Sequence, residues 1–123
     1  MSERFESNKG DVFPFSPTRS PSRPVPVVSF DRKELALILN VYGRKVAAGE
    51  WRDYALDFGR ERAMFSIYQR TSERPLFVVE KNPKLARRQG QYMVMGSDGR
   101  VLKRGHELSS VLRILDPQLH VVR

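Results

Sequence analysis

The sequence predicts a small α+β domain in which a helix precedes an antiparallel sheet of about five strands and a second helix follows it. Apolar residues recur at helical spacing near both ends of the domain. Between them they alternate with polar residues in short runs that turn residues separate. Strands joined by short turns form an antiparallel meander, and two helices with one apolar face each are expected to cover one face of it.

Residues 1–26 are expected to form a disordered, proline-rich arm in front of a single domain at residues 27–123. Between Pro14 and Pro26 the chain carries five of its eight prolines, a density that excludes a helix or a central strand. We favour an unstructured terminus as the interpretation of this arm. The alternative is a polyproline-type ligand or a phosphorylated Ser-Pro tract.

The first helix is expected to begin at Asp31, an N-cap residue with Glu34 as its capping-box partner. Its core-facing positions follow the spacing of one helical face and are Leu35, Ile38, Leu39, Tyr42 and Val46. Gly49 is suited to end the helix in the left-handed conformation.

A second apolar flank of this helix contains Leu37 and Val41. The helix therefore has a wider apolar surface than one core contact requires. We interpret the flank as covered by the chain's own termini. The alternative is a contact surface for a partner protein.

Strands are expected at residues 54–58, 63–67, 76–81, 91–95 and 100–103, where apolar and polar residues alternate between turn-rich connectors. The second helix carries its apolar residues at Leu108, Val111, Leu112 and Leu115. Asp116-Pro117 ends it. Residues 119–122 are expected to add an edge strand.

Composition and motifs argue against several classes of function. The 123 residues suit one domain, and the absence of cysteine excludes disulfides and thiolate chemistry and favours a cytoplasmic protein. No membrane-spanning run or signal peptide is visible. The two histidines, His106 and His120, belong to no motif, and no metal, cofactor or catalytic pattern is present. The sequence thus predicts a protein that is not an enzyme.

The formal net charge is +8, and residues 29–123 account for +7 of it. The most uneven segment, residues 81–105, holds seven basic residues against one acidic residue, Asp98. The candidate binding residues in it are Lys84, Arg87, Arg88, Arg100, Lys103 and Arg104. Such a cluster suits phosphate groups.

Antiparallel pairing predicts where this charge gathers. If residues 91–95 pair with residues 100–104 around a Gly-Ser-Asp-Gly turn, then Arg87, Arg88, Lys103 and Arg104 converge at the end of the hairpin away from the turn. Gln91 or Tyr92 is expected beside them for hydrogen bonding or stacking. The alternative is that basic residues on a strand edge only prevent aggregation.

The runs VSFDRKELALILNVYGRKVAAGEWRDYALDFG, FSIYQRTSERPLFVVEKNP and QYMVMGSDGRVLKRG resemble a family of short bacterial proteins, chiefly alphaproteobacterial, known as a domain of unknown function. The resemblance spans roughly residues 27–122. It implies a bacterial, cytoplasmic setting and brings no activity, cofactor or site residue.

Two functions follow from the residues themselves. The first is a binding protein whose basic patch contacts a polyanion, with nucleic acid or a ribonucleoprotein as its partner, without strong sequence specificity. The second is a protein-interaction module or accessory subunit that binds an acidic or apolar partner surface. The sequence does not indicate an oligomeric state.

Overall fold

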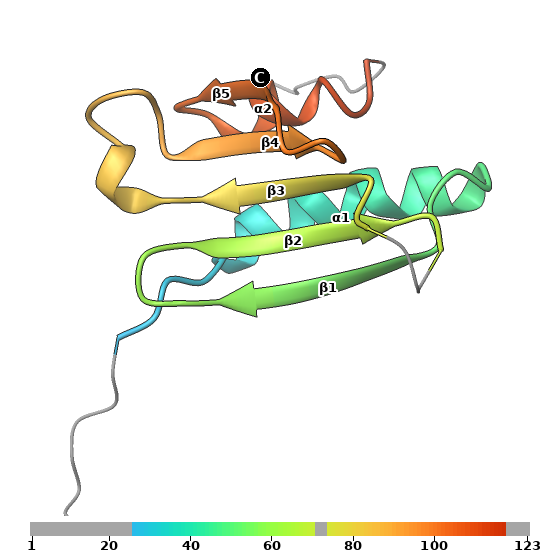
Figure 1. Ribbon diagram of the computed structural model, residues 1–123, viewed down its shortest axis with the longest axis horizontal. Helices are drawn as coiled ribbons and strands as arrows, with labels where there is room; N and C mark the ends of the chain where they lie inside the picture. The colour runs from blue at the N-terminus through green and yellow to red at the C-terminus, as the bar shows by residue number, and fades with distance from the viewer. Residues whose placement is uncertain (1–25, 71–73, 118–123) are drawn as a thin grey trace, which may run out of the picture.

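The computed structural model describes residues 26–70 and 74–117. Its elements are, in chain order, α1 (Arg32–Ala47), β1 (Asp53–Phe58), β2 (Ala63–Tyr68), β3 (Phe77–Lys81), the 3-10 helix η1 (Pro83–Leu85), β4 (Tyr92–Gly96), β5 (Val101–Gly105) and α2 (Leu108–Leu112). The strands form one sheet in chain order, and every neighbouring pair is antiparallel (Figure 1). The predicted order of helix, five-stranded meander and helix is confirmed. The expected arm, apart from Pro26, and the expected edge strand at 119–122 lie outside the described residues.

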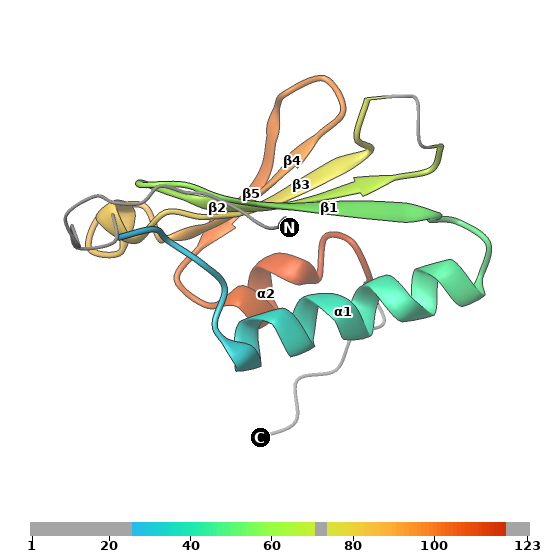
Figure 2. The same ribbon diagram turned by 90° about the horizontal axis from the view of Figure 1, so that it is seen from below.

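Both helices lie on the same side of the sheet (Figure 2). The core lies between them and the sheet, where alternate strand residues meet the helices. Its fully buried members include Ile38 and Val41 of α1, Phe65 and Ile67 of β2, Val79 of β3, Val94 of β4, and Val111 and Leu112 of α2. Neither α1 nor α2 has the length and apolarity that crossing a membrane requires.

Capping interactions define both ends of α1. The Glu34 amide donates to the Asp31 carboxylate at 2.8 Å, and the Asp31 amide donates to Glu34 Oε1 at 2.8 Å, so the predicted capping box is present. Gly49 has a φ of 79°, and its amide donates to the Val46 carbonyl at 2.9 Å. The Glu50 amide reaches the Lys45 carbonyl at the same distance. These two bonds form the Schellman motif that glycine favours.

The buried face of α1 is rotated from the one predicted. Ile38 and Val41 are each 1% exposed, whereas Leu39 and Val46 are 37% and 39% exposed. Val41, which the predicted core-facing stripe left out, is therefore a member of the core. The physical reason is that α2 and the sheet together contact a face centred between the two apolar stripes of α1, so that residues from both stripes are buried.

The strand register separates the sheet into two faces. Phe65 lies in the core, so its neighbours Met64 and Ser66 point to the side away from the helices, which we call the open face. One cross-strand row of the open face is Asp57, Met64, Glu80, Met93 and Arg104. The next row is Ala55, Ser66, Val78, Met95 and Val101. A register shift between β4 and β5 leaves Leu102 as an extra residue and keeps both Val101 and Arg104 in these rows.

The second helix is short, but its predicted apolar positions are all buried. Leu108, Val111, Leu112 and Leu115 are at most 6% exposed. After the helix, Asp116 accepts two hydrogen bonds from Arg44, from Nη2 at 2.7 Å and from Nε at 3.1 Å. Both donors reach the same carboxylate oxygen, Oδ2, and this ion pair connects the segment after α2 to the last turn of α1.

Candidate functional site

Three segments that are distant in sequence meet at one end of the sheet (Figure 1). They are the β1–β2 turn, the connection between β3 and β4, and the last residues of β5. Ala63 pairs with Lys81, Lys84 Nζ lies 3.3 Å from Glu61 Oε2, and Arg104 Nη1 lies 3.5 Å from the Gly90 carbonyl. The basic residues of this end, which we call the basic end, are Arg60, Arg62, Lys84, Arg87, Arg88 and Arg104.

Local hydrogen bonds hold the β3–β4 connection in a compact shape. The Asn82 side chain accepts from the Lys84 amide at 3.2 Å, and Pro83 starts η1, where a missing amide hydrogen costs nothing. The Leu85 carbonyl accepts from the amides of Arg88 and Gly90, at 3.0 and 2.9 Å. Arg88 is thus presented to solvent, with its neighbour Arg87, by an ordered backbone.

Part of the charge at the basic end is neutralised within the chain. Lys84 pairs with Glu61 in an exposed contact, and Arg62 Nη1 lies 3.4 Å from Glu80, whose carboxylate is almost fully buried. Across residues 26–70 and 74–117, by contrast, Arg60, Arg87 and Arg88 have no acidic partner. These three exposed guanidinium groups are therefore available to an external anion.

The structure brings together four of the six predicted binding residues, which are Lys84, Arg87, Arg88 and Arg104. Arg100 is placed elsewhere, because it belongs to the β4–β5 turn at the opposite end of the hairpin and lies beside Asp98. Lys103 is also separated from its neighbour. It lies opposite Val94, on the helix side of the sheet, whereas Arg104 lies opposite Met93 on the open face. Lys103 and Arg104 thus lie at the same end of the hairpin but on opposite faces of the sheet.

Sequence reasoning missed Arg60 and Arg62. Their position could have been derived from the order of the strands, because alternate turns of an antiparallel meander lie at the same end of the sheet. The first turn, Gly59–Arg62, therefore had to lie beside the third connection, which carries Arg87 and Arg88. The same argument assigns Arg100, in the fourth turn, to the other end.

A buried polar cluster lies behind the basic end, centred on Glu34. Its carboxylate accepts a hydrogen bond from Lys81 Nζ at 2.8 Å and a short one from the Tyr92 hydroxyl. Lys81 Nζ also donates to the Ser29 carbonyl at 3.0 Å. Tyr92 is thus a core residue, and it is not the exposed stacking partner that was expected beside the arginines.

This cluster is structural in character. Burial, and then the hydrogen bond to Glu34, raise the pKa of Tyr92 above its ordinary value of 10. The tyrosine therefore stays protonated and acts as a donor at neutral pH. Both oxygens of the Glu34 carboxylate have donors, and the cluster ties the start of α1 to β3 and β4.

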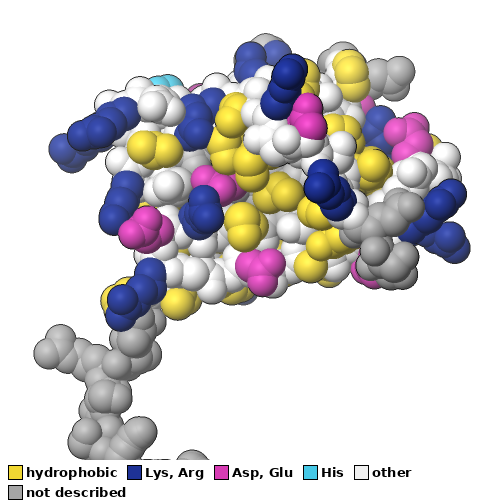
Figure 3. Space-filling view, viewed as in Figure 1, with side chains coloured by type: hydrophobic (Ala, Val, Ile, Leu, Met, Phe, Trp, Pro, Cys, Tyr) yellow, Lys and Arg dark blue, Asp and Glu magenta, His cyan; other side chains and the backbone are white. Residues whose placement is uncertain are grey.

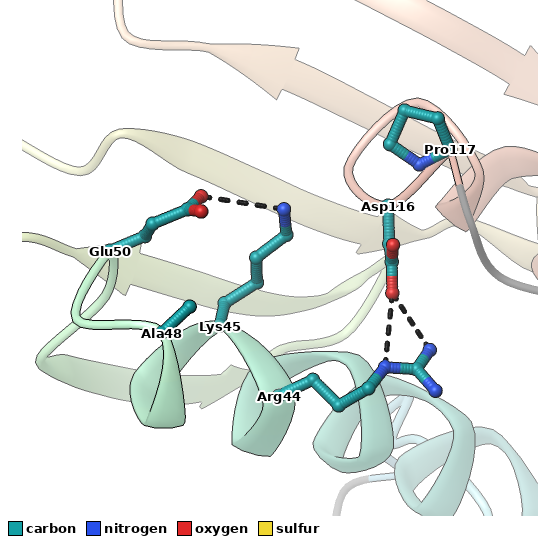
Figure 4. Close-up of a pocket in the computed structure, with 6 residues that line it drawn as sticks. All are labelled: Arg44, Lys45, Ala48, Glu50, Asp116 and Pro117. Carbon is teal, nitrogen blue, oxygen red and sulfur yellow. Dashed lines mark hydrogen bonds and ion pairs between the residues drawn. The ribbon is translucent and has the colours of Figure 1, made fainter.

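A polar hollow of about 430 Å³ lies at the other end of α1 (Figure 4). Arg44 and Lys45 point into it, and each contacts an acidic side chain that lines the same hollow, Asp116 at 2.7 Å and Glu50 at 3.3 Å. The charges of this hollow therefore satisfy one another. No cluster of three or more His, Asp or Glu side chains suited to a metal ion occurs within the described part of the chain.

Leu37, the other residue of the second apolar flank, is 37% exposed. It lines a shallow, mostly apolar hollow on the outer side of α1 with Lys33, Ala36 and Asn40. A larger apolar area lies on the open face. Seen from that side, apolar side chains run across the middle of the sheet between charged ones (Figure 3).

Comparison with known proteins returned one family. A family model described as "Protein of unknown function (DUF2794)" matches residues 28–112. The match covers more than half of the chain and runs from just before α1 to the end of α2. No curated protein and no solved structure matched.

Proposed function

We propose, for a chain that belongs to this family of unknown function, that the basic end binds a polyanion, namely the phosphate backbone of a nucleic acid. One observation carries the proposal. Two connections, separated by about twenty residues in the sequence, present Arg60, Arg87 and Arg88 at one end of the sheet, with no acidic partner among the described residues. Guanidinium groups bind phosphate oxygens in a bidentate way, and such contacts do not depend on base sequence.

The same proposal describes a cytoplasmic, non-enzymatic protein. The charged groups around Glu34 and in the hollow at Arg44 are already paired with one another, which leaves them little capacity for acid–base chemistry on a substrate. Contacts to phosphate alone support binding that is driven by charge and shape. Base-specific contacts are not part of the proposal.

The proposal is tested by fluorescence anisotropy with labelled single-stranded and duplex oligonucleotides over a series of salt concentrations. The variant R87A/R88A is expected to weaken binding on all sequences alike. For duplex DNA it is expected to reduce the slope of log affinity against log salt by about 2, since each phosphate contact contributes roughly 0.9. R60A is expected to reduce the slope by about 1.

The matched control is R52A/R74A, which removes two exposed arginines from the opposite end of the sheet. It lowers the net charge by the same amount. If net charge alone attracts the oligonucleotide, the two double variants weaken binding equally, and the assignment to the basic end is wrong. Binding that does not respond to salt would contradict the proposal as a whole.

A second candidate function is protein binding, favoured by the composition of the open face. Methionine and arginine are enriched at protein interfaces, and Met64, Met95 and Arg104 lie together on this face. Affinity purification with and without nuclease separates the two functions. Partners lost on nuclease treatment support nucleic-acid binding, and partners that persist support protein contact.

A further inference from the structure

The open face carries opposite, unpaired charges at its two edges. Asp57 of β1 and Arg104 of β5 occupy the two ends of one cross-strand row. Neither has an ion-pair partner within the described residues, and Arg104 instead lies over Met93, with Nη2 2.9 Å from the sulfur atom. Because β1 and β5 are separated by four strand spacings of about 4.8 Å, these two charges do not pair within one chain.

The interior of the open face is apolar and incompletely covered. Met64, Val78 and Met95 are half-buried, and Val101 at the β5 edge is 51% exposed. The one carboxylate in the interior, Glu80, is buried and contacts Arg62 of the same chain. The surface is therefore apolar in the middle, acidic at one edge and basic at the other.

We propose that the partner of this surface is the open face of a second copy of the chain. Consider a two-fold axis that lies between the two open faces, parallel to the strands and over β3. Rotation about it places the β1 edge of one copy over the β5 edge of the other and preserves positions along the strands. Asp57 of each copy then faces Arg104 of the other, and Met64 faces Met93. Glu80, on the axis, faces its own counterpart, and each of these buried carboxylates contacts Arg62 of its own chain. A two-fold axis across the strands does not produce this pairing.

The small area of the open face limits the proposed dimer to a weak, reversible one. Five strands about 4.8 Å apart, each five residues long with a rise of about 3.3 Å, cover a plane of roughly 20 by 16 Å. This is below the area of about 800 Å² per partner in a standard protein interface.

The dimer has a consequence for the basic end. Because the axis is parallel to the strands, the Arg87 and Arg88 loops of both copies lie at the same end of the dimer. Their mutual repulsion opposes dimerisation, and a polyanion that contacts both loops relieves it. Dimerisation itself does not depend on the proposed nucleic-acid binding, so each is tested alone.

The test is sedimentation equilibrium of the full chain, free of nucleic acid, over a wide range of concentrations. The wild type is expected to show a monomer–dimer equilibrium. D57R and R104E each place like charges across the interface and are expected to raise the dissociation constant at least about tenfold. An equal mixture of the two single variants is expected to restore the dimer, because each charge then faces its opposite.

The matched controls are E107R and R113E, which make the same charge changes at exposed positions that flank α2 on the other side of the sheet. They are expected to leave the equilibrium unchanged. Three outcomes would overturn the proposal: a wild type that is monomeric at every concentration, single variants that dimerise as well as the wild type, or a mixture that gains nothing over its components. Thermal unfolding of each variant checks that it is folded. If R104E proves to weaken the β4–β5 hairpin, the dissociation constant of D57R alone tests the interface.

A second measurement uses the absence of cysteine from the chain. The double variant D57C/R104C is expected to form a covalent dimer with a short thiol-specific bismaleimide crosslinker, because facing sheets lie about 10 Å apart. Neither single cysteine variant is expected to do so, because equivalent residues lie at opposite edges of the proposed dimer. A direct disulfide would need Cα atoms within about 7 Å, which is less than the spacing of facing sheets. Two positions four strands apart in one chain lie about 19 Å apart, beyond the reach of a short crosslinker. Equal crosslinking of single and double variants would contradict the proposed axis.

Discussion

Gly90 and Gly105 bring two backbones into contact at the base of the β4–β5 hairpin. Gly90 has a φ of 105°, and a Cβ atom placed on it would lie 2.4 Å from both the carbonyl carbon and the carbonyl oxygen of Gly105. No side chain fits between them. The contact holds the loop of Arg87 and Arg88 against the end of β5, next to Arg104.

Gly90→Ala is therefore expected to destabilise the fold strongly. The variant combines a positive φ, which costs an alanine roughly 1–2 kcal/mol, with a collision that only backbone movement relieves. Gly99→Ala is the matched control, since Gly99 has a φ of 82° and open space around the added methyl group. In urea unfolding, Gly90→Ala is expected to lower the free energy of unfolding by at least about 2 kcal/mol more than Gly99→Ala does. Equal decreases in the free energy of unfolding would show that the Gly105 backbone moves away from the added methyl group at little cost.

The ion pair between Glu34 and Lys81 yields a second prediction. Glu34→Gln removes the counter-ion of Lys81, whose side chain is 16% exposed, and weakens the capping box. Breaking a buried pair from one side costs roughly 3–5 kcal/mol. The control Glu50→Gln breaks the exposed pair with Lys45 and is expected to cost at most about 1 kcal/mol. Similar free energies of unfolding for the two variants would contradict a central role for Glu34.

Much of this fold was predictable because its signals are local. The capping box at Asp31 and Glu34, the left-handed Gly49 and the alternating strands each depend on residues near one another in the sequence. The packing of α1 was not predictable in the same way. Its apolar residues form two stripes, and only the position of α2 decides that Val41 is buried and Leu39 is not.

The candidate site was predictable in part for a similar reason. Arg87 and Arg88 were recognisable from charge density, whereas Lys103 and Arg104 are separated by strand alternation, whose phase depends on the register with β4. The environment of Tyr92 could not be predicted from nearby residues. A tyrosine at the start of a strand between basic segments suggests an exposed aromatic residue, but a carboxylate 58 positions earlier in the sequence accepts its hydroxyl.

The environment of Tyr92 predicts how stability depends on pH. Its pKa is raised in the folded state, so folding favours the protonated hydroxyl. The resulting stabilisation is fully present below the ordinary pKa of 10 and is lost as the pH rises above it, because the unfolded chain releases the proton first. Urea unfolding from about pH 8 to about pH 11 is expected to show a steeper decline for the wild type than for Tyr92→Phe.

Tyr92→Phe also changes stability at neutral pH. It removes a hydrogen-bond donor from the buried Glu34 carboxylate and is expected to cost about 1–3 kcal/mol. Tyr42 provides the control, because burial also raises its pKa, although it has no hydrogen bond to a carboxylate among the described residues. Tyr42→Phe is expected to keep most of the stability at neutral pH. If the free energy of unfolding of the wild type and of Tyr92→Phe declined equally at high pH, Tyr92 would have the same pKa in the folded and the unfolded state.

Leu37 and Val41, the two residues of the second apolar flank of α1, are expected to respond in opposite ways to an introduced charge. Val41→Asp places a carboxylate at a position that is 1% exposed, between α2 and the sheet, and a buried unpaired charge of this kind costs several kcal/mol. Leu37→Asp places the same group on the outer side of α1, where surface substitutions change stability by about 0.5 kcal/mol or less. Circular dichroism is expected to show an unfolded or greatly destabilised Val41→Asp and a folded Leu37→Asp. A folded Val41→Asp variant would mean that α2 separates from α1 at little cost. The Arg44–Asp116 ion pair, which connects α1 to the segment after α2, would then be expected to contribute little to stability.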